Sequence, residues 1–144
     1  MTHALRNRPA ADVALGYAAD PNGSGIVFAT VDTGTTSSVV RVPFRVHRLS
    51  GLDGREIGYA AVAAVAAHLR SRGFGRVRLR VADTHVVDEL TGVKSVPPAL
   101  SMPYVAARCV LHGFAAARIE CADLRDVADL TNRAIAEATL HVAA

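Results

Sequence analysis

The order of hydrophobic periods along the 144 residues restricts the fold more than any other feature. Three strand-like segments come first, over 13–19, 25–31 and 38–46, and two more follow over 76–82 and 116–122. Short turns separate the first three, whereas helical segments precede the last two. Strands joined by short turns pair antiparallel, and strands joined through helices pair in parallel. The sequence therefore predicts an α/β fold with a mixed five-stranded sheet, three antiparallel meander strands and two parallel strands, with helices on its faces.

Turn-forming residues set the limits of the early strands. The first segment ends at Asp-Pro-Asn-Gly (20–23), residues that fix φ or tolerate positive φ. In the third segment, 38–46, apolar residues alternate with others, which is the period of a sheet exposed on one face. Pro43 lies inside that segment and has no N–H to donate to a ladder. The third strand is therefore expected at an edge of the sheet.

Helical spacing begins at Gly58. Between 58 and 72, apolar residues recur at i, i+3, i+4 and i+7, which predicts an amphipathic helix; they are Val62, Val65, Ala66 and Leu69. A short helix is expected after the cap-like residues Asp83 and Thr84. Two longer helices are expected over 97–111 and 127–140.

Length and composition limit the class of protein. Size predicts one domain, 12–144, after a flexible N-terminal tail, 1–11. No apolar run approaches the roughly 20 residues of a membrane span, and no targeting pattern is evident, so a cytoplasmic protein without a membrane partner is expected. The net charge of +3 and the pI of ≈ 9.3 are compatible with an anionic partner. Cys109 and Cys121 lie among apolar neighbours and are expected to be small core residues rather than a disulfide.

Four short stretches, taken in order, are similar to motifs of one known family. DPNGSGIVF (20–28) looks like its Asn-Pro-Gly turn between the first two strands, and GYAAVAAVAAHLRSRG (58–73) like its first helix, which usually begins Glu-Tyr. ADTHVVDELTG (82–92) resembles the segment with an Asp-Ser pair after the fourth strand, and VADL (127–130) resembles the start of the last helix. With this spacing, the chain resembles the ribonuclease H family, of the type 1 fold, from about residue 14 to 138.

The resemblance implies a metal-dependent hydrolase. The family's chemistry uses four carboxylates that hold two divalent cations, Mg²⁺ or Mn²⁺, at the carboxyl edge of the central strands. Carried onto this chain, the fourth-strand acid is Asp83 and the last-helix acid is Asp129. These two are the candidate catalytic and metal-binding residues.

The other two acids of that set are missing. The first-strand acid falls on Ala14, Leu15 or Gly16, and the first-helix glutamate falls on Gly58. Glu56 lies two residues before Gly58 and is the candidate substitute if the helix begins early. We expect Gly58 at the start of its helix, on the end that faces Asp83. The resemblance therefore implies that the active site of this chain is degenerate.

Two features have structural interpretations as well as functional ones. Asp83 fits a helix N-cap as well as a metal ligand. Arg76, Arg78 and Arg80 share one face of their strand and form a candidate nucleic-acid-binding stripe. The simpler interpretation of the stripe is that Arg78 and Arg80 pair with Glu120 on the neighbouring strand.

Three functions follow, in order of preference. The first is a catalytically impaired ribonuclease H-like domain that binds duplex nucleic acid, either RNA/DNA hybrid or double-stranded RNA. The second is an active Mg²⁺-dependent endoribonuclease that cleaves the RNA of RNA/DNA hybrids with a relocated acid. The third is a non-catalytic protein-interaction scaffold, with a homo-oligomer formed through an edge strand, such as the third.

Overall fold

The chain forms one mixed five-stranded sheet. The structure is a computed structural model that describes residues 10–47 and 54–143. The strands stand in the order β3-β2-β1-β4-β5, with the bounds β1 (Ala10–Ala19), β2 (Ser24–Asp32), β3 (Ser37–Arg45), β4 (Arg76–Val81) and β5 (Ala116–Cys121). β1 pairs antiparallel with β2, and β2 with β3, whereas β4 is parallel to both β1 and β5. The predicted fold class and the edge position of β3 are confirmed.

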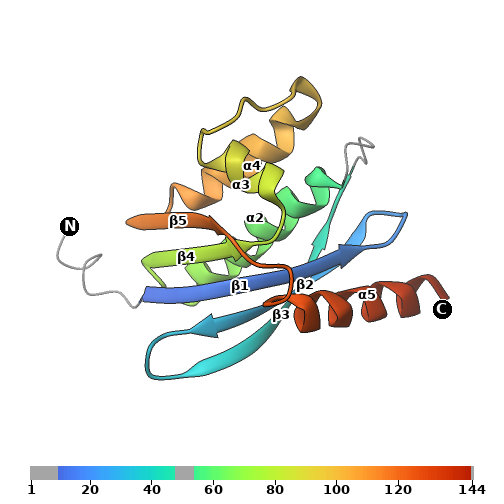
Figure 1. The fold of residues 1–144 in the computed structure, drawn as a ribbon, viewed down its shortest axis with the longest axis horizontal. Coiled ribbons are helices and arrows are strands. Elements are labelled where there is room, and N and C mark those ends of the chain that lie inside the picture. Colours follow the sequence, from blue (N-terminus) through green and yellow to red (C-terminus); the bar gives the residue numbers. More distant parts are fainter. Residues whose placement is uncertain (1–9, 48–53, 144) are drawn as a thin grey trace.

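Helices cover both faces of the sheet, as Figure 1 shows. The helical elements are α2 (Arg55–Ser71), α3 (Thr84–Leu90), the 3₁₀ turn η1 (Pro98–Leu100), α4 (Ser101–Leu111) and α5 (Ala128–Ala143). α2, α3 and α4 lie on one side, and α5 packs against β1 and β2 on the other. No helix within 10–47 and 54–143 is long and apolar enough to cross a membrane.

The side chains of each strand point alternately to the two faces of the sheet, and a hydrophobic core forms on each face. On the α2 side, Val13, Leu15 and Leu79 are almost fully buried against apolar residues of α2. On the α5 side, a smaller cluster joins the sheet to the last helix; it consists of Ile26, Phe28, Leu130 and Ala134. Because successive residues of a strand point to opposite faces, one strand contributes to both layers.

Several observed bounds differ from the sequence-based ones. Ala10 and Ala11, expected in the tail, belong to β1, where they pair with Arg76 and Val77 of β4. Alanines carry no clear period, so the pattern alone does not reveal this extension. The first helix begins at Arg55 rather than at 58, directly after Gly54, whose φ of 72° is a left-handed conformation that glycine adopts without strain.

Two other expectations were wrong. The helix expected over 97–111 is divided into η1 and α4. Both cysteines are exposed, not buried: Cys109 lies on the outer surface of α4, and Cys121 ends the edge strand β5. An apolar neighbourhood in sequence does not bury a side chain when the element itself is at the periphery.

Candidate functional site

Asp83 follows β4 and begins α3. Its Oδ1 accepts hydrogen bonds from the backbone N–H groups of His85 at 3.0 Å and Val86 at 3.2 Å. These bonds satisfy donors that the first turn of a helix otherwise leaves unpaired. The capping interpretation of Asp83 is confirmed, and one of its carboxylate oxygens is therefore engaged by the fold.

Tyr17 fills the space next to Gly58. β1 and β4 run in parallel with Ala14 paired to Arg80, so Tyr17 and Asp83 each lie three residues beyond the same rung. A Cβ at position 58 would lie 2.9 Å from the Tyr17 hydroxyl oxygen and 3.0 Å from Cγ2 of Val86. Gly58 is thus in the first turns of α2 and against the start of α3, at the end expected from the sequence. The absence of a side chain there makes room for the phenol.

Burial raises the pKa of Tyr17, and the negative charge of Asp83 raises it further. Both effects disfavour the phenolate. The hydroxyl therefore stays protonated at neutral pH. Sequence analysis missed this residue, because an aromatic in an apolar strand looks like ordinary core.

Two of the three β1 positions to which the resemblance assigns an acid, Leu15 and Gly16, have no room for a carboxylate. Leu15 is a core residue. Gly16 points to the opposite face, where α5 crosses so closely that a Cβ would lie 2.3 Å from the backbone nitrogen of Thr131. An aspartate at position 16 would require α5 to shift.

The arginine stripe on β4 is only partly neutralised. Arg78 donates to Glu120 of β5 at 2.8 Å and lies 3.7 Å from Asp12 of β1. The bond to Glu120 is the main reason that the pKa of Arg78 is raised. Arg80 is in register with Glu120, yet it forms no ion pair within the described residues, and neither does Arg76. The pairing prediction is thus confirmed for Arg78 and wrong for Arg80, because the carboxylate turns to the preceding arginine.

A buried ionic cluster fixes α2 to α3. Glu89 is 3% exposed, and it accepts from Arg55 at 2.8 Å and from the Tyr59 hydroxyl at 2.5 Å. Burial and this hydrogen bond raise the pKa of Tyr59. The Tyr59 ring also meets Tyr104 of α4 edge-on, with centroids 6.1 Å apart. Sequence analysis did not reveal the cluster, because Glu89 lies 34 positions from Arg55 and 30 from Tyr59.

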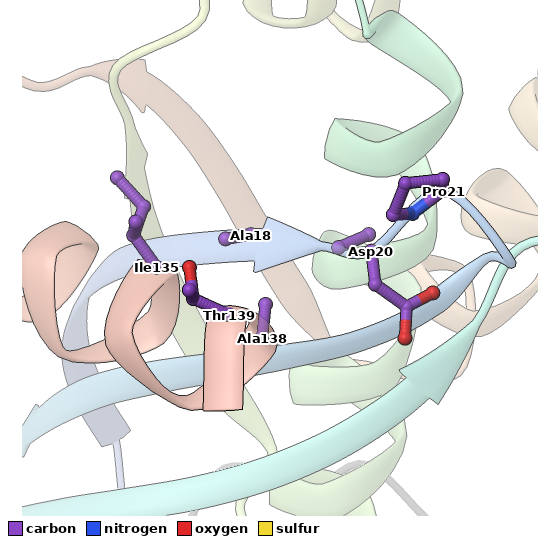
Figure 2. A pocket seen from close by; sticks show the side chains of 7 residues that line it. Ala18, Asp20, Pro21, Ile135, Ala138 and Thr139 are labelled. Carbon is purple, nitrogen blue, oxygen red and sulfur yellow. The ribbon is translucent and has the colours of Figure 1, made fainter. Parts of the chain in front are cut away.

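Figure 2 shows a hollow between the β1–β2 turn and α5. It measures 380 Å³ and is lined mainly by alanine, Pro21, Ile135 and Thr139. Among the described lining residues the one carboxylate is that of Asp20, whose Oδ1 accepts from the backbone N–H groups of Asn22 and Ser24 at 2.8 and 3.1 Å. Its role is to hold the turn, and the hollow has no comparable group for a ligand.

Comparison with known proteins identifies the fold through solved structures and not through the sequence. No protein-family model matches the sequence, and no curated protein does. Among solved structures, RNase H1 of the halophilic archaeon Halobacterium salinarum matches with a TM-score of 0.71 and 21% identity, over 89% of this chain and 98% of that one. The N-terminal RNase H domain of a Mycobacterium tuberculosis protein matches with a TM-score of 0.74 and 18% identity, over 93% and 99%. The chain has the ribonuclease H fold.

A third structure with the ribonuclease H fold is LC11-RNase H1 in complex with RNA/DNA hybrid. It matches with a TM-score of 0.64 and 15% identity, over 90% of this chain and 99% of that one. These matches confirm the resemblance drawn from the four sequence stretches, as far as the fold is concerned.

Of the four acids that the ribonuclease H resemblance implies, the matching positions of this chain hold two, Asp83 and Asp129. Asp129 is exposed in the first turn of α5, the helix on the far face of the sheet. Glu56 is buried in the first turn of α2. Within residues 10–47 and 54–143, no three side chains of His, Cys, Asp or Glu gather closely enough to hold a metal ion. The donor set therefore does not fit a two-cation centre, which needs several converging oxygen ligands.

Proposed function

We propose that this chain binds duplex nucleic acid, either RNA/DNA hybrid or double-stranded RNA, without cleaving it. The observation that carries the proposal is the contact between Tyr17 and Gly58. A neutral phenol occupies the space beside Asp83 where the resemblance calls for carboxylates. The proposal is supported by a fold shared with a protein in complex with RNA/DNA hybrid, and by the finding that no three possible metal ligands gather among the described residues.

The charge of the described surface supports binding. Arg76 and Arg80 are exposed on one face of β4 and have no ion-pair partner within the described residues. Each is free to neutralise a phosphate, and such contacts give affinity without sequence preference. A strand rises about 3.3 Å per residue, so the two side chains start about 13 Å apart and reach separate phosphates.

Binding is tested by fluorescence anisotropy with labelled RNA/DNA hybrid and double-stranded RNA. We expect affinity to fall steeply with salt, and the R76Q/R80Q variant to reduce the slope of log K against log salt by about 1 to 2. The control is Arg45→Gln, which removes one arginine charge from β3, the edge strand furthest from β5. Absence of binding at low salt would refute the proposal and favour the interaction scaffold instead.

Cleavage is tested separately with Mg²⁺ and with Mn²⁺ on RNA/DNA hybrid. We expect no rate above that of Asp83→Asn prepared in parallel, which controls for contaminating nuclease. Asparagine caps a helix about as well as aspartate, so this variant retains the start of α3. Cleavage by the unmodified chain but not by the variant would show that another acid, Glu56 first among the candidates, completes a working centre.

A further inference from the structure

β5 leaves one edge of the sheet open. It pairs with β4 on one side only, and four of its six residues are exposed. The N–H and C=O groups of alternate residues on its free side have no strand partner in the described part of the chain. Such an edge is a template for another strand.

The other edge of the sheet is protected. β3 contains Pro43, which cannot donate to an added strand. It also carries Arg41, whose guanidinium is held at 2.8 Å by Glu137 of α5. β5 has no proline, lysine or glycine. A partner strand is therefore favoured at β5 and not at β3.

The charges of β5 are self-complementary. Its two charged residues, Arg118 and Glu120, lie on either side of Ile119. Two antiparallel copies of β5 that cross at Ile119 place Arg118 of each copy opposite Glu120 of the other. Only every second residue directs its backbone N–H and C=O groups to the open edge, so the pairing of the two copies can change only in steps of two residues. The two nearest alternative registers place Arg118 opposite Arg118 or Glu120 opposite Glu120. Like charges directly opposite are destabilising, which leaves one favoured register.

Both charged groups are available for this contact. Arg118 has no ion pair within the described residues. Oε2 of Glu120 accepts a hydrogen bond from Arg78 at 2.8 Å, and Oε1 can accept one from a second guanidinium. Arg78 also holds the Glu120 side chain in place, so less conformational freedom is lost on association.

We propose that a second copy of this chain pairs antiparallel with β5 about a two-fold axis at Ile119. The product is a dimer with a continuous sheet, in which two Arg118–Glu120 pairs lie across the interface. The interaction is isologous, since the same patch serves on both copies. Because the axis is perpendicular to the sheet, the β4 stripes of both copies lie on the same face. The proposal does not depend on nucleic-acid binding.

The test is sedimentation equilibrium of the full chain without nucleic acid, from about 5 µM to about 500 µM, a range that detects even weak association. We expect a monomer–dimer equilibrium for the unmodified chain. Arg118→Glu alone and Glu120→Arg alone each create two like-charge pairs, and each is expected to weaken dimerisation at least tenfold. Arg45→Glu, a charge reversal on β3, serves as the control and should dimerise normally.

The mixture of the two variants decides the register. The Arg118→Glu variant has glutamate at both 118 and 120, and the Glu120→Arg variant has arginine at both. A heterodimer of the two variants therefore has an attractive pair at each of the two contacts. We expect the mixture to regain the dimer that neither variant forms alone. Circular dichroism of each variant verifies that it is folded. A monomeric unmodified chain at all concentrations, or an equimolar mixture of folded variants that stays monomeric, overturns the proposal and leaves duplex binding untouched.

Discussion

The contact between Tyr17 and Gly58 can be measured as a coupling energy. The perturbation is Gly58→Ala, made in the unmodified chain and in Tyr17→Phe. An alanine Cβ would lie 2.9 Å from the Tyr17 hydroxyl oxygen, closer than such atoms normally approach. In Tyr17→Phe that oxygen is gone, and the nearest atom of the ring is Cζ at 3.5 Å. The clash with residue 17 is then reduced to an ordinary contact.

Two opposing effects determine the sign in the unmodified chain. Replacing glycine by alanine inside a helix stabilises it by about 0.5–1 kcal/mol. Overpacking a well-filled site costs about 1–3 kcal/mol. We therefore expect Gly58→Ala to lower the free energy of unfolding by about 1 kcal/mol in the unmodified chain. In Tyr17→Phe it should be neutral or stabilising by up to about 1 kcal/mol, because the 3.0 Å contact with Val86 remains.

The assay is urea unfolding of the four proteins of the double-mutant cycle, followed by circular dichroism. The expected coupling between positions 17 and 58 is about 1–2 kcal/mol, within the range for residues in contact. Equal effects of Gly58→Ala in both backgrounds would show that the Tyr17 hydroxyl does not lie against Gly58. Tyr17 would then not occupy the space beside Asp83 where the resemblance implies a glutamate.

Three further predictions test other parts of the structure. Glu89→Ala should lower the free energy of unfolding by about 3 kcal/mol in urea titration, because it leaves Arg55, whose side chain is 15% exposed, without its partner. Since the folded-state pKa of Tyr59 is raised above its unfolded value of about 10, stability should be constant below that pH and fall above it, and Tyr59→Phe should reduce this fall in melts taken across alkaline pH. Gly16→Ala should lower the melting temperature, because its Cβ would lie 2.3 Å from the backbone nitrogen of Thr131; an unchanged melting temperature would argue against the close packing of α5 on β1.

Local patterns were sufficient for the fold but not for the site. The alternation of apolar and polar residues in β3 and the helical spacing of apolar residues in α2 are patterns of neighbouring residues. The fold class and the strand topology could therefore be predicted from them. The sequence also showed that position 58, where the resemblance implies a glutamate, holds a glycine. The role of Tyr17 was not, because it depends on how β1 and α2 approach each other across the sheet. The cluster of Glu89 with Arg55 was hidden for the same reason, since it joins residues 34 positions apart.

The same packing indicates that the carboxylates which the resemblance implies cannot be introduced at positions 58 and 16 one at a time. A glutamate at position 58 needs the space of the Tyr17 phenol, so Tyr17 must change first or together with it. Replacing Tyr17 by a small residue alone would leave a void beside α2, which itself destabilises the protein. A first-strand aspartate at position 16 needs room that the backbone of α5 at Thr131 occupies, so a helix would have to move as well. Each of these two substitutions therefore costs stability before the full set of carboxylates is present to bind two cations.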